Sequence, residues 1–306
     1  MSRMRSLVLT GALLSATTAT AAACGSGGAA TGDGKPAVMA AFYPLQWISQ
    51  QVGGPDVSVA GLTKPGTEPH DLELTARQVA DIQDSSLVVY IKGVQPAVDE
   101  AVEGHASAKA FDAASAVTTL PATAGEEGHA DVSYDPHIWL DPSRLATVAG
   151  KLGERLAEAD PAHAAAYRQR AATTAAELNK LDEAYRTGLT GCGKKAIVTS
   201  HSAFGYLAAR YGLEQIAVSG LDPDAEPSPT RLAQVADVAK RENVTTIFTE
   251  ELVSPKVAEI LAKEVGAKTA VLNPIESEPD GGDYLSAAKQ NLEALRKALE
   301  CPTTEG

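Results

Sequence analysis

Short apolar runs alternate with amphipathic segments from Pro36 onwards, and this rhythm predicts strands alternating with helices. In the first half, strands are expected at Val38–Tyr43, Val57–Leu62, Leu87–Ile91 and Lys109–Asp112, and helices at Gln46–Val52, Thr75–Asp84 and Val94–Glu103. In the second half, strands are expected at Lys195–Thr199, Gln215–Val218, Thr246–Thr249 and Thr269–Leu272, and helices at Ala203–Tyr211, Pro229–Glu242, Pro255–Val265 and Gly282–Glu300. Such alternation indicates an α/β fold of βαβ units with parallel sheets.

A long helical region separates these halves. One helix is expected at Arg144–Ala159, and Asp160 with Pro161 then begins a second. In the second helix a single apolar stripe is predicted, at steps of mostly three and four residues, consisting of Tyr167, Ala171, Leu178, Leu181, Tyr185 and Leu189. A helix of roughly 26 residues extends about 39 Å, long enough to lie along two lobes.

The N-terminus has the pattern of an export signal. Arg3 and Arg5 precede a short apolar run that ends in small residues before Cys24. A cysteine after three alanines is similar to the acylated cysteine of bacterial lipoproteins, although the usual leucine three positions earlier is absent. The alternative is an ordinary signal with an incidental cysteine. We expect a signal peptide at 1–23 and a Gly/Ala-rich tether at 24–36, attached through a lipid on Cys24 to the outer face of the cell membrane.

The two remaining cysteines are Cys192 and Cys301. Disulfides persist outside the cytoplasm, so an exported chain favours a bond between them. Two free buried thiols are the alternative.

Charge excludes one class of partner. The chain has 26 Lys and Arg against 39 Asp and Glu, and loss of the signal would leave 24 against 39. Nucleic-acid binding depends on cationic contacts to phosphates, so this balance argues against it. Neither a Gly-x-Gly-x-x-Gly motif nor a P-loop is present for a dinucleotide or phosphate.

Three of the six histidines stand where chemistry is expected. His70 lies in a turn beyond the strand Val57–Leu62, His137 lies between two Asp-Pro pairs, and His201 follows the strand Lys195–Thr199. Ligands of open α/β sheets bind at the carboxyl ends of the strands. Each histidine alone is more often a surface or capping residue, but together they suggest one metal ion. The carboxylates near these histidines in the sequence, which are candidates for orienting the imidazoles, are Glu68, Asp71, Asp135 and Asp141.

Six segments in this order strengthen that interpretation: GTEPHDLELT, DPHIWLDP, TSHSAFGYLAARYGL, AEPSP, IFTEELVSPKVAEILAKEVG and VLNPIE. From Val38 to Leu299 the chain resembles the zinc and manganese solute-binding lipoproteins of bacterial ABC transporters, in particular their zinc-binding branch. The resemblance implies two (β/α) lobes joined by one long backbone helix, with metal in the cleft between them. We expect lobes at 37–142 and 191–306 and a linking region at 143–190.

The resemblance also implies the ligands. They fall on His70, His137, His201 and a carboxylate, Glu276, for which Asp280 is a rival. Three imidazoles and one carboxylate suit Zn²⁺. The manganese members are similar but carry Glu where His201 stands, and oxygen ligands suit Mn²⁺, so zinc is expected over manganese.

Other features receive lesser roles. Thr118–Ser133 replaces a longer histidine-rich loop of many zinc members and offers only Glu126, Glu127 and His129. A solvated linker is expected, and a loop that helps to load the ion is the alternative. His105 and His163 are expected at the surface. Trp139 is expected beside the site. Glu226 is expected to brace its loop or cap the next helix.

Three function classes remain to be compared. The resemblance favours a monomeric, non-enzymatic protein that captures zinc for an ABC permease. A metal-binding adhesin or metallochaperone would use the same fold without a dedicated permease. A zinc hydrolase is disfavoured because His-Glu-x-x-His and Gly-x-Ser-x-Gly are absent, and four protein ligands leave no position for water.

Overall fold

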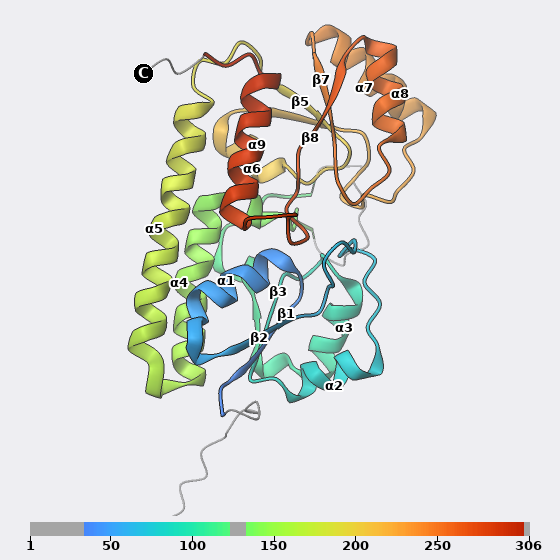
Figure 1. The fold of residues 1–306 in the computed structure, drawn as a ribbon. Helices are drawn as coiled ribbons and strands as arrows, with labels where there is room; N and C mark the ends of the chain where they lie inside the picture. The colour runs from blue at the N-terminus through green and yellow to red at the C-terminus, as the bar shows by residue number, and fades with distance from the viewer. Residues whose placement is uncertain (1–33, 123–132, 303–306) are drawn as a thin grey trace, which may run out of the picture.

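Two four-stranded parallel sheets form the framework of the chain (Figure 1). The structure, a computed structural model, describes residues 34–122 and 133–302. The first sheet has the order β2-β1-β3-β4 and the second the order β6-β5-β7-β8. The strands are β1 Ala37–Ala40, β2 Ser58–Gly61, β3 Leu87–Tyr90, β4 Ala110–Asp112, β5 Ala196–Thr199, β6 Glu214–Ala217, β7 Thr246–Thr249 and β8 Lys268–Val271. The predicted α/β class with parallel sheets is confirmed.

Helices follow the strands as the apolar spacing predicted. They are α1 Tyr43–Gly53, α2 Ala76–Asp84, α3 Pro96–His105, α4 Pro142–Ala159, α5 Ala164–Gly188, α6 Gly205–Tyr211, α7 Pro229–Arg241, α8 Lys256–Val265 and α9 Tyr284–Ala298. No helix among the described residues combines the length and the apolar composition that crossing a membrane requires.

Several predicted boundaries differ from the structure by one to three residues, and two of these differences have clear local reasons. The first strand ends at Ala40, and Tyr43 belongs to α1, because Pro44 in the first turn favours helix. Helix α9 begins at Tyr284 rather than at Gly282. Gly281 and Gly282 have φ near +90°, outside the helical region, and Asp283 then caps the helix in a capping box with Ser286.

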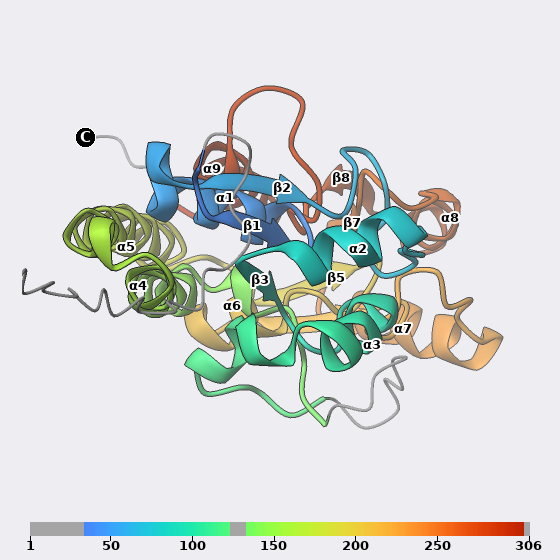
Figure 2. The same ribbon diagram turned by 90° about the horizontal axis from the view of Figure 1, so that it is seen from below.

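Helices α4 and α5 lie side by side, and α5 runs past both sheets (Figures 1 and 2). They approach closely at Gly153, where an added Cβ would come within 2.7 Å of the Ala171 side chain. The predicted stripe of α5 is buried. Arg170 donates to the carbonyl of Val52 near the first sheet, and Tyr185 donates to the carbonyl of Ala288 in α9. Helix α5 is therefore attached at both ends to different halves.

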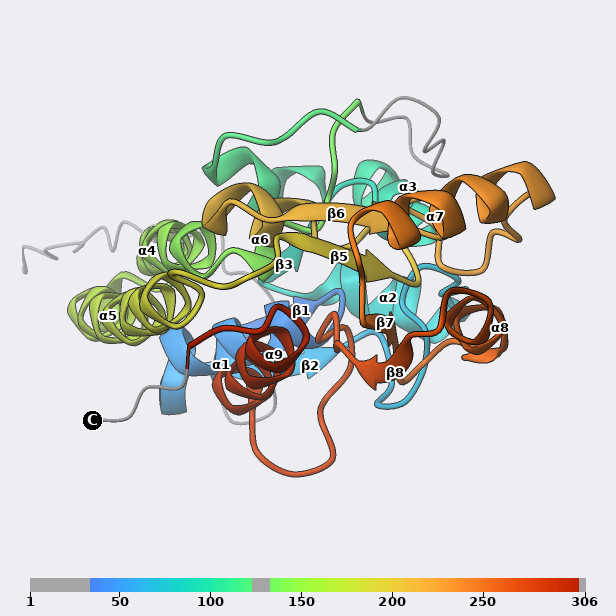
Figure 3. The ribbon, with the colours of Figure 1, turned by 90° about the horizontal axis from the view of Figure 1, so that it is seen from above.

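The main apolar core is continuous between the halves. It includes the central strands of the first sheet, with Leu87, Val88 and Val89 buried, and reaches Phe248 and Leu272 of the second half. A second cluster fills the far side of the second sheet. The predicted disulfide joins Cys192 to Cys301 and links the end of α5 to the end of α9. Figure 3, viewed from above, shows the wide loop between β8 and α9 outside the sheets.

Candidate metal centre

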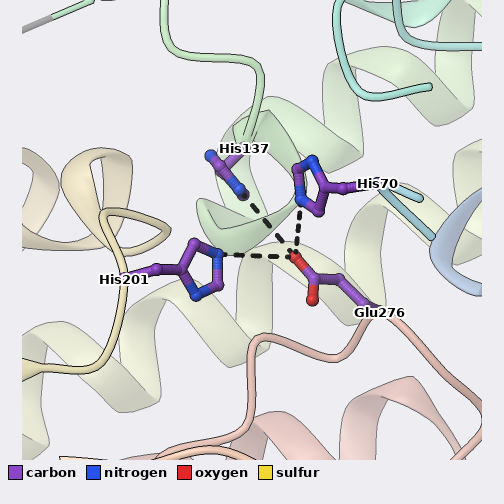
Figure 4. Close-up of side chains that lie close together, drawn as sticks. All are labelled: His70, His137, His201 and Glu276. Atoms are coloured by element: carbon purple, nitrogen blue, oxygen red, sulfur yellow. Dashed lines mark ion pairs between the residues drawn. The ribbon is translucent and has the colours of Figure 1, made fainter. Parts of the chain in front are cut away.

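Four side chains point toward one another (Figure 4), and they come from segments that follow strands of both sheets. His70 lies in the loop after β2, His137 in the segment between β4 and α4, His201 two residues after β5, and Glu276 in the loop after β8. One potential ligand atom from each lies within 4.8 Å of the other three. The structure thus brings together the four residues that the sequence singled out.

The ligand atoms of the four side chains face one another at the centre of the cluster. Glu276 Oε1 lies 3.5 Å from Nε2 of His70 and 3.8 Å from Nε2 of both His137 and His201. All three Nε2 atoms and both carboxylate oxygens are buried and make no hydrogen bond to any residue that the structure describes. Burying polar atoms without partners is costly. The arrangement therefore indicates a ligand that accepts electron pairs from all four side chains at once.

A neighbouring carboxylate orients His137. Asp135 Oδ1 lies 2.8 Å from the His137 Nδ1 and accepts a 2.9 Å hydrogen bond from the His137 backbone N–H. The imidazole is fully buried. Because Nδ1 is engaged with Asp135, Nε2 is left to face the centre as an electron-pair donor.

His201 has the same arrangement with a residue that the sequence reasoning missed. Glu250, the residue after β7, places Oε2 2.7 Å from His201 Nδ1 and accepts from the His201 backbone N–H at 3.1 Å. Both side chains are buried. The available signal was the acidic pair in IFTEELVSP, directly at the carboxyl end of the strand Thr246–Thr249.

His70 is held less tightly. Glu68 accepts from the backbone N–H of His70 at 3.1 Å, so this carboxylate shapes the turn. The His70 side chain is 9% exposed, against 0–1% for the other three. Asp71, another predicted neighbour, is exposed. The solvent-facing side of the site is therefore the side of His70.

Hydrogen bonds from Asn291 on α9 and from Trp139 hold the loop that carries Glu276. Asn291 on α9 accepts from the Asn273 backbone N–H at 2.8 Å and donates to its carbonyl at 2.6 Å. Trp139 Nε1 donates to the Pro274 carbonyl at 2.7 Å, and its ring lies 5.0 Å from that of His137. Trp139 thus packs beside the site as expected. The rival ligand, Asp280, is exposed and outside the cluster.

Burial and neighbouring charges shift the pKa values of the four cluster side chains in different directions. Burial favours a raised pKa for Glu276, but His70 and the charges of His201 and His137 outweigh it and lower the pKa to about 2. Burial opposes charge on His201, but Glu250 raises its pKa to about 9. The pKa of His70 is also raised, because Glu276 outweighs burial. Burial and the neighbouring histidines hold the pKa of His137 well below 6.5.

The remaining candidates take structural roles or lie outside the described residues. Asp141 caps α4 by accepting from the backbone of Ser143 and Arg144, so it does not orient an imidazole. Ser228, not Glu226, caps α7, and Glu226 is exposed. His105 and His163 are at the surface. Cys24, Glu126, Glu127 and His129 fall outside the described residues.

The donor set fits a tetrahedral ion. Bonds of 2.0–2.1 Å place the ligand atoms of tetrahedral zinc about 3.3 Å apart. The observed separations are 3.5–3.8 Å between Glu276 and the imidazoles and up to 4.8 Å within the whole set of ligand atoms, so the four side chains would have to draw together around a bound ion. Calcium and magnesium prefer all-oxygen ligands, which this site does not provide.

Two curated relatives resemble most of this chain. It is 37% identical over 283 residues to the zinc-binding lipoprotein AdcA of Streptococcus pneumoniae, covering 88% of this chain and 56% of AdcA. The chain thus spans about half the length of that relative. It is 36% identical over 300 residues to the high-affinity zinc uptake system protein ZnuA of Bacillus subtilis, covering 91% of this chain and 93% of ZnuA.

A solved structure has the same fold. The laminin-binding protein Lmb of Streptococcus agalactiae, described as bifunctional with adhesin and metal-transporting activity, superposes with a TM-score of 0.79 at 34% identity. The match covers 86% of this chain and 99% of Lmb. The model of the family described as ZnuA, zinc-uptake complex component A, periplasmic, matches residues 38–298. The chain therefore belongs to the ZnuA family.

Proposed function

We propose that this protein captures one Zn²⁺ outside the cytoplasm, using His70, His137, His201 and Glu276, and delivers it to an ABC permease. One observation carries the proposal: three imidazole nitrogens and a carboxylate converge in a buried site and have no hydrogen-bond partner among residues 34–122 and 133–302. The names of AdcA and ZnuA, which describe zinc binding and zinc uptake, support it.

The donor set favours zinc over manganese. Imidazole nitrogen suits Zn²⁺, whereas Mn²⁺ prefers more oxygen ligands and a higher coordination number. Asp135 and Glu250 would hold His137 and His201 with Nε2 free for the ion. With four protein ligands no position is left for a reacting water, so the site suits a cargo rather than a catalyst.

The proposal extends to organisation and location. Residues 37–142 and 191–306 would form two lobes around the ion, with 143–190 as the linking region. A lipid on Cys24 and the tether 24–36 would hold a monomer on the outer face of the cell membrane, near the permease. The lipoprotein name of AdcA supports the anchor.

Metal analysis with a selectivity variant tests the site. We expect one zinc per purified chain and a clear preference for Zn²⁺ over Mn²⁺ in titrations. His201→Glu adds a second carboxylate, so zinc should bind at least roughly tenfold more weakly while manganese gains relative to zinc. His105→Glu, at the exposed end of α3, makes the same chemical change away from the site and is the matched control. A zinc affinity indifferent to His201 would refute the ligand assignment.

Growth under zinc limitation tests the partner. Cells lacking the protein should grow poorly when zinc is scarce and recover with the wild type but not with Glu276→Gln. If this recovery also requires the permease that a neighbouring gene encodes, the result supports delivery of zinc to that permease. Normal growth of the deletion strain, with loss of surface adhesion instead, would favour the adhesin activity described for Lmb.

A further inference from the structure

Glu276 presents one of its two carboxylate oxygens to the histidines. Its Oε1 lies 3.5–3.8 Å from the Nε2 atoms of the three imidazoles. Figure 4 shows the second oxygen, Oε2, directed away from His70 and His137. Oε2 has no hydrogen-bond partner among the described residues, so no contact of its own fixes the rotation of the carboxylate. The orientation of Glu276 therefore comes from the loop that carries it.

The turn before Glu276 has an unusual backbone conformation. Ile275 has a φ of 59°, in the left-handed region, which is unfavourable for a β-branched side chain. Backbone strain of this kind persists only where surrounding contacts impose it. One such contact is a hydrogen bond of 2.6 Å from the Ile275 N–H to Oδ1 of the Asn273 side chain. Asn273 thus acts directly on the strained residue that precedes the carboxylate ligand.

The other end of the same amide holds a second loop. Asn273 Nδ2 donates to Glu251 Oε2 at 2.8 Å. Glu251 lies after β7, next to Glu250, which orients the His201 imidazole. A backbone N–H on one side and a carboxylate on the other require a group that both accepts and donates, and a primary amide does both. Asn273 therefore connects the loop of Glu276 to the loop that positions His201.

The backbone of Asn273 is held independently of its side chain. Asn291 on α9, which is buried, accepts from the Asn273 N–H at 2.8 Å and donates to its carbonyl at 2.6 Å. Neither bond involves the Asn273 amide. Removing that amide therefore frees the turn at Ile275 and Glu276, while the loop stays attached to α9.

We propose that Asn273 is a positioning residue that determines metal specificity: its side chain fixes the turn so that Glu276 offers one oxygen to the ion and the site stays four-coordinate. The inference rests on the proposed function. Four-coordinate sites rich in imidazole suit Zn²⁺, whereas Mn²⁺ prefers more oxygen ligands and a higher coordination number. Once the turn is freed, Glu276 can rotate and offer both oxygens. Asn273 thus disfavours manganese instead of strengthening metal binding in general.

Separate titrations of Asn273→Ala with Zn²⁺ and with Mn²⁺, against a competing chelator, test this. Zinc affinity should fall roughly fivefold, the factor that one ordinary net hydrogen bond is worth, while manganese affinity stays the same or rises. The ratio of zinc affinity to manganese affinity should therefore fall at least roughly fivefold. Asn179→Ala, at an exposed position of α5, makes the same chemical change away from the site and should leave this ratio unchanged.

A reversed pair tests the hydrogen bond itself. Asn273→Asp keeps an oxygen for the Ile275 N–H, but it places a second negative charge against the Glu251 carboxylate, so the affinity ratio should fall. Adding Glu251→Gln replaces that carboxylate by an amide that donates back across the same contact. The double variant should therefore recover the wild-type ratio.

The two metals separate a specific role from a purely structural one. Equal losses of zinc and manganese affinity in Asn273→Ala would overturn the proposal, because damage to the loop alone weakens both metals alike. An unchanged ratio in Asn273→Ala, or no recovery in the double variant, would overturn it too. A wild-type protein that binds no zinc would instead overturn the proposed function itself.

Discussion

Glu250 Oε2 lies 2.7 Å from Nδ1 of His201, and both side chains are buried. The two residues follow adjacent strands, β7 and β5, so the sheet order itself brings them together. The same carboxylate accepts from the His201 backbone N–H, which fixes the loop as well as the ring. One acidic side chain thus sets where His201 Nε2 points.

Glu250→Gln should therefore weaken zinc binding. An amide retains the shape but loses the charge that makes the imidazole a stronger donor, and loss of such a partner costs about 10–100-fold in metal affinity. Competition titrations with a zinc chelator measure the change. Glu226→Gln, an exposed carboxylate in the same half, should bind zinc like the wild type. Equal affinities in both variants would show that Glu250 does not tune the site.

The pH dependence of zinc binding should follow His201. Its raised pKa of about 9 means that the metal-free imidazole is protonated near neutral pH, and zinc must displace that proton. Apparent zinc affinity should rise by up to roughly tenfold per pH unit for each proton displaced. Titrations from pH 6.5 to 9 measure this rise. In Glu250→Gln the rise should end at lower pH, because the main cause of the raised pKa is gone.

The free energy of unfolding of the metal-free protein should fall as the pH rises, whereas the zinc affinity rises. A folded-state pKa above the unfolded value contributes stability that is complete below about pH 6.5 and is lost as pH rises through about 9. Urea unfolding of chelator-treated protein should therefore give a lower free energy of unfolding at pH 9 than at pH 6.5. An unchanged difference after Glu250→Gln would assign the effect to another group.

The choice of carboxylate can be tested directly. Glu276→Gln should weaken zinc binding by more than roughly 100-fold, the upper range for partners that only orient a ligand. Asp280→Asn makes the same change at an exposed position of the same loop and should have little effect. Isothermal titration with zinc measures both. A larger loss for Asp280→Asn would reverse the assignment and require the loop to rearrange.

The sequence predicted the three histidines because each follows a recognisable strand or turn, and parallel strands end at one edge. It did not predict Glu250 as the partner of His201, since local patterns do not give the strand order that makes β5 and β7 neighbours. Closeness in sequence was also misleading. Asp141 stands near His137 along the chain but caps α4, and Asp71 follows His70 but faces solvent.

Long-range contacts account for the rest of what was missed. The Gly66–Ser277 hydrogen bond joins loops 211 residues apart, and Asn291 holds the Glu276 loop from a helix. Neither has a signature in residue spacing. By contrast, the buried stripe of α5 was predictable, because helical periodicity alone determines which side chains share a face.

Asp182 on α5 should contribute strongly to stability. Its carboxylate accepts from Arg210 at 2.8 Å through both oxygens, from Arg186 at 2.8 Å and from Tyr211 at 3.1 Å, and its pKa is lowered chiefly by Arg210. The carboxylate is 9% exposed but its arginine partners are more open, so Asp182→Asn should cost about 2 kcal/mol, below the range for a fully buried pair. The loss should shrink as the pH falls below about 4, because a lowered folded-state pKa contributes its full stability only above the unfolded value near 4 and loses it as the pH falls through the folded-state value. Glu183→Gln, 68% exposed on the same helix, should change the free energy of unfolding by less than about 0.5 kcal/mol. Equal effects of the two substitutions in urea unfolding would mean that α5 is held by its apolar stripe and not by this carboxylate.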